Sequence, residues 1–285
     1  MAPQSVDDRF DEEAESLDEL GVEHAWISTE DVVDGELDRA LDELPEDMGE
    51  VLYRGWMLTA DEYEALHSAL SDRGWYLVND PCAYAQAHYL PNYYPAIEAQ
   101  AAETRWTWGT DLAEAWEVAQ ELGSPPYVLK DHVKSVKEDW RGCCLIPAGA
   151  DRGTFNEICS RFIAQRDDRF EGGLVFKRFL PLSPLANQIG DSTYNDEYRL
   201  FFWRGDLVLA CPYHEQGSPP TTFGDFAHLG SRIASSFFTV DVARLITGGW
   251  TVVEVGDGGV STIPKGTNPS DLYEAVVGHR RRRDV

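Results

Sequence analysis

The amino-acid composition changes sharply near residue 50, and this break limits how much of the chain can build a core. The first 50 residues contain nineteen Asp or Glu, two Arg and no Lys. A segment with so much unbalanced charge buries too little apolar surface to offset the entropy lost on ordering. We expect residues 1–50 to be an acidic extension, disordered or partly helical, and the folded part to begin at residue 51.

The first folded segment has the pattern of a β-α-β unit. Val51–Trp56 and Trp75–Val78 are short apolar runs typical of strands, and Thr59–Glu62 has the spacing of a capping box that starts a helix. An apolar stripe predicts a further helix at Asp111–Leu122. We assign residues 51–125 to a small α/β N-terminal domain, in which the aromatic stretch AYAQAHYLPNYYP is expected to be mostly loop.

Strands dominate the prediction for residues 126–265. They are Tyr127–Lys130, Gly173–Phe179, Glu197–Trp203, Leu207–Ala210, Phe237–Ala243 and Trp250–Val255. A helix is expected at Phe226–Ser236 between the last two pairs. The C-terminal segment, residues 266–285, is expected to hold one short helix, Pro269–Val277, before it ends in an arginine-rich tail.

The net charge of -26 argues against partners that are themselves anionic. Such a surface repels nucleic-acid backbones and acidic membranes, so we interpret the four arginines of the tail as a charge cluster at a helix end. No apolar run approaches the roughly 20 residues that span a bilayer, and the N-terminus lacks a basic stretch followed by an apolar one. We expect a cytoplasmic protein that binds neither nucleic acid nor membrane.

Lysine is scarce, with five in the chain against nineteen arginines, yet three of the five lie between Lys130 and Lys137. Lys130 ends a predicted strand, and Lys134 and Ser135 lie just beyond it. Ammonium groups and a hydroxyl clustered at a strand end are what a polyphosphate requires. In the alternative, Lys134 and Lys137 are surface residues of a helix, balanced by the two acidic residues that follow them.

Three carboxylates stand near the last two predicted strands. Asp241 and Glu254 lie on strands that a Gly-Gly turn separates, and strand alternation allows both side chains to share one face. Together with Asp257 they offer hard oxygen ligands for Mg²⁺, with phosphates supplying the others. A cross-strand carboxylate pair without a cation would be repulsive. The alternative is that these residues are simply exposed on an acidic surface.

Lys177, Glu197 and Arg199 add charge to strands that are otherwise apolar and aromatic. An arginine on such a strand needs an anionic partner. That partner is either a phosphate or substrate carboxylate, or Glu197, which lies two residues away on the same strand face. The sequence leaves this choice open.

Five segments, taken in order, carry a resemblance to a known family. They read PPYVLKDHVKSVKEDW, GGLVFKRFLPL, NDEYRLFFWRGDLV, SSFFTVDVAR and GGWTVVEVGDGGVSTIP. In order and spacing they resemble the ATP-grasp superfamily, and within it the clade named for one arginine and two lysines. The resemblance extends upstream to YRGWMLTADEYEAL and covers about residues 51–265.

The resemblance implies an α+β protein with the ATP-grasp fold, in which two α+β subdomains clamp a nucleotide. The ATP-grasp domain would span residues 126–265 and follow the small α/β N-terminal domain. The implied cofactors are ATP and Mg²⁺. Its lysines and its magnesium-binding carboxylates are expected to converge on a single cleft.

The resemblance also assigns roles to individual residues. Lys130 matches the lysine that touches the phosphates, and Lys134 and Ser135 stand where many relatives have a glycine-rich loop. The remaining matches are Phe176, Lys177, Arg178 and Phe179 in the segment against which adenine stacks, with Lys177 near the base or the phosphates, Glu197 and Arg199 facing the ribose and the reacting phosphate, and Asp241 and Glu254 as metal ligands. One departure is that most relatives have Asn where this chain has Gly256, so Asp257 is assumed to be the third ligand.

The activity implied by the resemblance is that of an ADP-forming ligase. A substrate carboxylate attacks the γ-phosphate of ATP, and an amine captures the resulting acylphosphate. Lys130, Lys177 and Arg199 would stabilise the charge on the transferred phosphoryl group. The substrates would be small-molecule or peptide carboxylates and amines. The alternative function is a nucleotide-binding regulatory or assembly protein that has lost catalysis.

Overall fold

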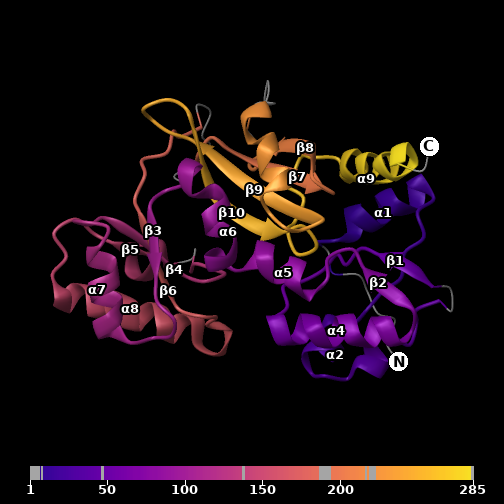
Figure 1. The fold of residues 1–285 in the computed structure, drawn as a ribbon, viewed down its shortest axis with the longest axis horizontal. Helices are drawn as coiled ribbons and strands as arrows, with labels where there is room; N and C mark the ends of the chain where they lie inside the picture. The colour runs from indigo at the N-terminus through magenta and orange to yellow at the C-terminus, as the bar shows by residue number, and fades with distance from the viewer. Residues whose placement is uncertain are drawn as a thin grey trace. The chain divides into compact units, whose positions relative to one another are not determined.

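A computed structural model describes residues 7, 9–45, 48–136, 139–185, 194–215, 217 and 223–283 (Figure 1). The chain forms two compact units. The first unit consists of Met1–His88, Pro184–Val242 and Glu254–Val285, and the second consists of Tyr89–Ser183 and Ala243–Val253. Neither unit is a continuous stretch of chain, so each contains residues that are distant in sequence.

The N-terminal part of the first unit contains a β-α-β unit as predicted, but its first strand shares only Val51 with the predicted strand Val51–Trp56. Strands β1 (Gly49–Val51) and β2 (Trp75–Leu77) pair in parallel, with helix α4 (Ala60–Asp72) between them in sequence. The predicted capping box is present, because the Thr59 hydroxyl accepts from the Glu62 amide at 3.3 Å and the Glu62 carboxylate accepts from the Thr59 amide at 2.7 Å. This local signal was sufficient to locate the start of the helix.

The described part of the acidic extension is helical and packed. It forms α1 (Asp11–Leu20), α2 (Thr29–Val33) and α3 (Leu37–Ala40). Val32 and Leu41 are buried in a core shared with α4, and the acidic Glu13 and Asp31 are 5% and 3% exposed. The segment was expected to be disordered or partly helical and to precede the folded part, but its charge did not keep these helices out of the core. The reason is that Glu13 pairs with Arg54, and Asp31 pairs with Arg39.

The C-terminal part of the first unit contributes most of a four-stranded sheet in the order β10-β9-β7-β8, in which the end of β9 and the start of β10 belong to the segment Ala243–Val253. Its strands are β7 (Glu197–Trp203), β8 (Asp206–Pro212), β9 (Phe237–Arg244) and β10 (Trp250–Asp257), and a final helix is α9 (Pro269–Arg283). The predicted β7–β8 hairpin is confirmed, with positive φ angles at Arg204 and Gly205 in the turn. Between the two strand pairs the structure has a 3-10 helix at Gly224–Ser231 in place of the α-helix expected over Phe226–Ser236.

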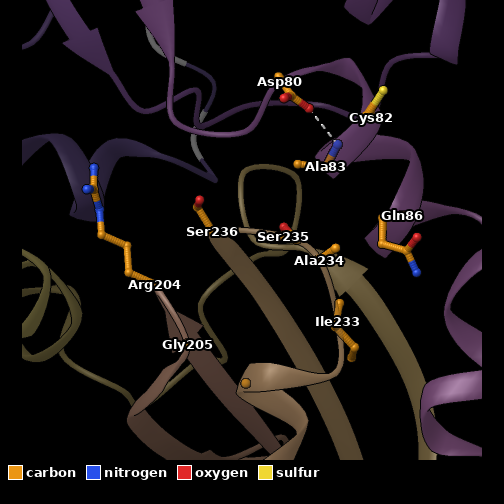
Figure 2. Close-up of a pocket in the computed structure, with 11 residues that line it drawn as sticks. Asp80, Cys82, Ala83, Gln86, Arg204, Gly205, Ile233, Ala234, Ser235 and Ser236 are labelled. Atoms are coloured by element: carbon orange, nitrogen blue, oxygen red, sulfur yellow. Dashed lines mark hydrogen bonds between the residues drawn. The ribbon is translucent and has the colours of Figure 1, made fainter.

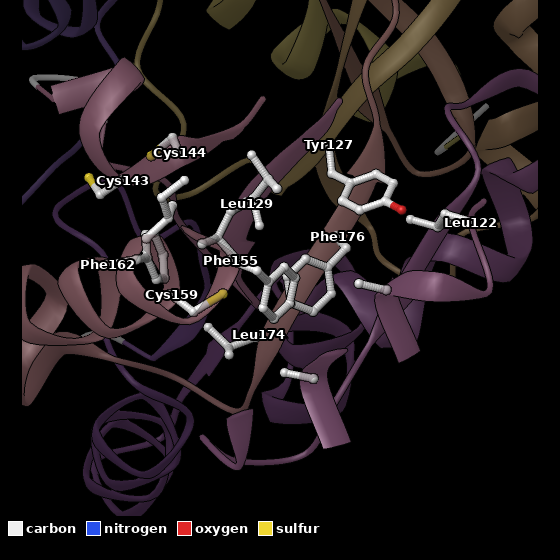
Figure 3. Close-up of a cluster of buried hydrophobic side chains, with 14 residues drawn as sticks. Leu122, Tyr127, Leu129, Cys143, Cys144, Phe155, Cys159, Phe162, Leu174 and Phe176 are labelled. Carbon is white, nitrogen blue, oxygen red and sulfur yellow. The ribbon is translucent and has the colours of Figure 1, made fainter. Parts of the chain in front are cut away.

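The second unit has a four-stranded sheet in the order β3-β6-β4-β5. Its strands are β3 (Thr104–Trp106), β4 (Tyr127–Asp131), β5 (Leu145–Ile146) and β6 (Leu174–Arg178), and all its strand pairs are antiparallel. Helices α7 (Leu112–Gln120) and α8 (Arg152–Arg166) pack against this sheet (Figure 1). Figure 3 shows the core between them, where the rings of Phe155 and Phe176 lie 5.3 Å apart.

The stretch AYAQAHYLPNYYP, which was expected to be loop, is largely helical. It contains α5 (Pro81–His88) and the start of α6 (Leu90–Ile97). Pro91 is tolerated because a proline in the first turn of a helix removes an amide that has no helical partner there. Burial of the aromatic rings Tyr84, Tyr93 and Tyr94 supplies the packing that short helices need.

Candidate functional site

Lys130 and Lys177 lie on neighbouring strands of the second unit and share one face of its sheet. Lys177 on β6 is opposite Val128 on β4, and Lys130 is two residues further along β4. Residues directly opposite each other, and those two apart on one strand, point to the same face. The two lysines are therefore diagonal neighbours, about 7–8 Å apart at the backbone. One face of this sheet thus carries two of the five lysines of the chain.

Asp131 builds the turn that follows Lys130. Its fully buried carboxylate accepts hydrogen bonds from the amides of Val133 at 2.7 Å and Lys134 at 2.5 Å, and it pairs with Nε of Arg166 on α8 at 2.7 Å. The Asp131 amide also donates to the Lys134 carbonyl at 2.9 Å. The sequence pattern alone did not identify Asp131, although an aspartate at the first position of a tight turn is its signal.

Phe176 and Lys177 point to opposite faces of β6. Phe176 is completely buried in the core beside α8, so its ring is not on the face that carries the lysines. Lys177 is partly exposed, and its Nζ donates to the Val253 carbonyl at 2.5 Å. The strand alternation therefore separates two residues that the family resemblance had grouped around the adenine.

The other predicted nucleotide-binding residues of the second unit occupy more open positions. Arg178 is exposed and pairs with Glu103 at 3.1 Å, and its Nη2 also donates to the Leu122 carbonyl. Phe179 is 39% exposed, just beyond the end of β6. Lys134 and Ser135 are partly buried in the loop after β4. Lys137, the third lysine of the cluster, lies outside the described residues.

In the first unit, Arg199 on β7 is held by Asp241 on β9. Its Nε and Nη2 donate to the two carboxylate oxygens at 2.8 and 2.7 Å, and its Nη1 donates to the Thr262 carbonyl at 2.8 Å. The guanidinium also lies over the ring of Tyr213, 4.9 Å from its centroid. Both partners of the pair are buried, with 8% and 3% exposure. The sequence left the partner of Arg199 open, and the structure pairs it with Asp241.

The electrostatics of this pair keep Arg199 charged. Burial alone would lower the pKa of Arg199, but the charge and hydrogen bonds of Asp241, with smaller contributions from Tyr213 and Glu254, raise it above its ordinary value. A bidentate arginine–carboxylate pair also fixes the plane of the guanidinium. Arg199 is therefore a permanent and well-oriented cation beside two carboxylates.

The third predicted ligand, Asp257, lies on the opposite face of β10 from Glu254, as expected for residues three apart on a strand. It accepts from Nδ2 of Asn79 at 2.5 Å and from the Gly259 amide at 2.7 Å, and it is 1% exposed. Burial raises the pKa of Asp257 to about 7, although these hydrogen bonds act in the other direction. In the described part of the chain, no three His, Cys, Asp or Glu side chains are grouped closely enough to hold a metal.

A family model for the ATP-grasp domain matches residues 121–276, and it describes family 3 of the clade named for one arginine and two lysines. The chain belongs to this ATP-grasp family. Both lysines of the shared sheet face and the Arg199–Asp241 pair lie within the matched residues. A comparison with curated protein sequences finds no match.

Solved structures agree with the ATP-grasp fold, which here is of the α+β class. A RimK domain ATP-grasp protein from Sphaerobacter thermophilus is 17% identical, with 96% of this chain and 94% of that chain covered and a TM-score of 0.60. The ATP-grasp ligase PsnB, complexed with a precursor variant, Mg and ADP, is 13% identical with a TM-score of 0.55, covering 96% and 94%. The macrocyclase MdnC from Microcystis aeruginosa, bound with a precursor peptide, is 12% identical with a TM-score of 0.54, covering 96% and 97%.

This ATP-grasp protein also has an open hollow of about 700 Å³ in its first unit. Figure 2 shows Asp80 at the start of α5 and Arg204 in the β7–β8 turn on separate walls of it. None of the eleven residues that line it is among those predicted to bind nucleotide or metal. The hollow therefore does not coincide with the predicted site.

No helix among the described residues is long and apolar enough to cross a bilayer.

Proposed function

We propose that the protein is a ligase that uses Mg²⁺ and ATP to join a carboxylate to an amine through an acylphosphate. The observation that carries the proposal is the shared sheet face of Lys130 and Lys177 in a chain with so few lysines. Membership of the ATP-grasp family supports the same conclusion. Two ammonium groups on one face suit a triphosphate, whose charge must be neutralised for phosphoryl transfer.

Arg199 is the proposed stabiliser of the transferred phosphoryl group. Its fixed plane and permanent charge suit an anion whose charge develops during the reaction. Asp241 and Glu254 are the proposed Mg²⁺ ligands because they offer hard oxygens. Each Asp241 oxygen that accepts from Arg199 keeps another lone pair, so the ion pair and a cation can share this carboxylate. When bound, Mg²⁺ would neutralise phosphate charge.

Asp257 is left out of the proposed ligand set, and Phe176 out of the proposed adenine contact. Asp257 faces away from Glu254 and is engaged by Asn79, and Phe176 is a core residue. Peptide carboxylates are the first substrates to test, since PsnB and MdnC are each known in complex with a precursor or precursor peptide. The nucleophile on such a peptide is its carboxylate, and an amine then displaces phosphate.

The test is calorimetric titration with ATP, ADP and a non-hydrolysable analogue, with and without Mg²⁺, followed by an assay for ADP with candidate acids and amines. Lys130→Ala and Lys177→Ala are each expected to weaken ATP binding by about 10- to 100-fold, the range for one lost charged hydrogen bond. Lys265→Ala is the matched control, because Lys265 is exposed and outside the predicted site.

Two outcomes would contradict the ligase. If Lys130→Ala, Lys177→Ala and Lys265→Ala bind ATP with the same affinity, the nucleotide does not bind at this sheet face. Tight Mg–ATP binding without ADP formation for any acid and amine pair would instead favour the catalytically inactive nucleotide-binding protein.

A further inference from the structure

Arg54, in the segment between β1 and α4, is partly buried and contacts three different parts of the first unit. Its Nε and Nη2 donate to the two carboxylate oxygens of Glu13 at 2.8 and 2.6 Å. Its Nη1 donates to the carbonyls of Gly258 and Ser261, the second at 2.8 Å. Its side chain is only 10% exposed. One guanidinium thus links the N-terminal extension to the loop that follows β10.

Glu13 belongs to α1, within the acidic extension, and is itself held from a second direction. The hydroxyl of Tyr273 on α9 donates to its Oε2. Burial alone would lower the pKa of Arg54, but Glu13 and then Tyr273 raise it above its ordinary value, so the guanidinium stays charged. A buried pair of this kind is fixed in geometry because neither partner can be left alone without a large penalty.

The loop held by Arg54, residues 258–262, is also the loop that holds Arg199. Arg54 binds the carbonyl of Ser261, and Arg199 binds the carbonyl of the next residue, Thr262, at 2.8 Å. The loop is tied further by the Gly55 amide, which donates to the Gly259 carbonyl at 3.0 Å. Consecutive carbonyls on one short loop therefore accept hydrogen bonds from Arg54 and Arg199.

The Thr262 carbonyl is one of two anchors that orient Arg199. Asp241 takes Nε and Nη2 and thereby leaves Nη1 to Thr262. With Asp241 alone, the two side chains could move together as a unit. The backbone anchor ties the pair to loop 258–262, which also accepts hydrogen bonds from Arg54.

The geometry points to Glu13 and Arg54 as positioning residues of the proposed active site: they fix loop 258–262 and, through the Thr262 carbonyl, the guanidinium of Arg199. This inference rests on the proposed role of Arg199 in phosphoryl transfer. It also gives the acidic extension a role in the proposed site. Helix α1 contributes Glu13, which binds Arg54; Arg54 binds loop 258–262, and this loop binds Arg199. Neither Glu13 nor Arg54 touches that phosphate.

The test compares two double variants that act on the same helix. Glu13→Met with Arg54→Met removes both charges together and so leaves no uncompensated buried ion. Ser16→Ala with Ser270→Ala removes the hydroxyl pair that joins α1 to α9 at 2.7 Å and does not touch the loop. Two readouts are measured: hydrogen exchange of the Arg199 Nε–H by ¹⁵N NMR, assigned by its loss in Arg199→Lys, and kcat and KM for ATP.

We expect the methionine variant to exchange the Arg199 Nε–H about tenfold faster, because the held guanidinium becomes mobile. We also expect its kcat to fall by about 10- to 100-fold, the effect of displacing a reacting group by a fraction of an ångström to one ångström, while KM changes less than about twofold. The alanine variant is expected to match the wild type in both readouts. A folded methionine variant with wild-type exchange and kcat would overturn the inference.

Arg54→Lys keeps the inference testable if the methionine variant does not fold. A lysine retains one charged contact to Glu13 but cannot hold a bidentate pair and two carbonyls at once. We expect intermediate exchange and an intermediate kcat, and wild-type values for both would contradict the inference. The NMR readout needs no substrate, so a wild-type protein that forms no ADP would count against the ligase while the exchange data still decided the positioning role.

Discussion

The cations proposed to bind phosphate are positioned differently in the two units. In the second unit, strand register brings Lys130 and Lys177 to one face, and Lys177 donates to an uncharged backbone carbonyl. In the first unit, Arg199 is buried with Asp241 and tied to a loop by a network of side chains. Backbone pairing therefore positions the lysines, whereas side-chain ion pairing positions the arginine. We therefore expect substitution of Asp241 to affect folding, and substitution of Lys177 to affect mainly binding.

The largest expected effect is on the Arg199–Asp241 pair. Asp241→Ala leaves a buried guanidinium without its counter-charge and should lower the free energy of unfolding by about 3–5 kcal/mol. The double variant Arg199→Met with Asp241→Met should lie much closer to the wild type, because both charges are removed. Urea unfolding of the three proteins measures this. If Asp241→Ala is as stable as the double variant, ion pairing does not hold this part of the first unit.

A second effect concerns Asp257 and pH. Its pKa of about 7 in the folded protein lies above the ordinary value of 3.8, so between these two pH values the folded state binds more protons than the unfolded state. Stability from this group therefore falls as pH rises from about 4 to about 7, by an amount on the order of 4 kcal/mol. Asp257→Asn should remove that loss. The difference in unfolding free energy between variant and wild type should grow over this window and then level off.

A constant difference across the same window would contradict the burial argument for Asp257. The comparison is made as a difference because the contributions of the other carboxylates of this acidic chain are common to both proteins.

A smaller effect is expected at Lys177. Lys177→Met removes a hydrogen bond to the Val253 carbonyl, so we expect a loss of about 1–2 kcal/mol of stability. The same change should weaken Mg–ATP binding much more clearly. Parallel measurement of unfolding and of ATP affinity checks this. A loss as large as that of Asp241→Ala would remove the contrast between the two units.

The smallest expected effects are at two helix caps, one in each unit. Thr59 caps α4 in the first unit, and Asp111 caps α7 in the second, where its carboxylate accepts from the Ala113 and Glu114 amides. Replacing either cap by alanine should cost about 1 kcal/mol, because each is a local contact. Similar values from urea unfolding would show that local contacts count equally in both units. If the two alanine variants lose amounts of unfolding free energy that differ several-fold, the two units differ in general stability. The contrast would then not come from how their charged residues are positioned.

Local patterns predicted much of the fold. The capping box at Thr59, the parallel β1–β2 pair and the β7–β8 hairpin follow from residues close together in sequence. The stretch AYAQAHYLPNYYP was misjudged because its prolines and aromatic rings suggested a loop, whereas ring burial stabilises α5 and α6. Helix α8 has a weakly patterned sequence and was not predicted at all.

The candidate site was also only partly predictable from the sequence. Spacing within strands decides faces, so the separation of Glu254 from Asp257 and of Phe176 from Lys177 was readable in principle from strand alternation. The roles assigned to the individual residues by the family resemblance remain predictions. No pattern near Arg54 indicated its bonds to Glu13 and to loop 258–262.

The family, the scarcity of lysine outside one cluster and most of the strands were readable from the sequence alone, whereas β3 and β5 were not predicted. Only the tertiary structure decided that Arg199 pairs with Asp241, 42 residues away, and that Glu13 of the acidic extension pairs with Arg54. The physical reason is that periodicity and capping act over a few residues, whereas a buried charge must be paired by whichever opposite charge the fold brings to it.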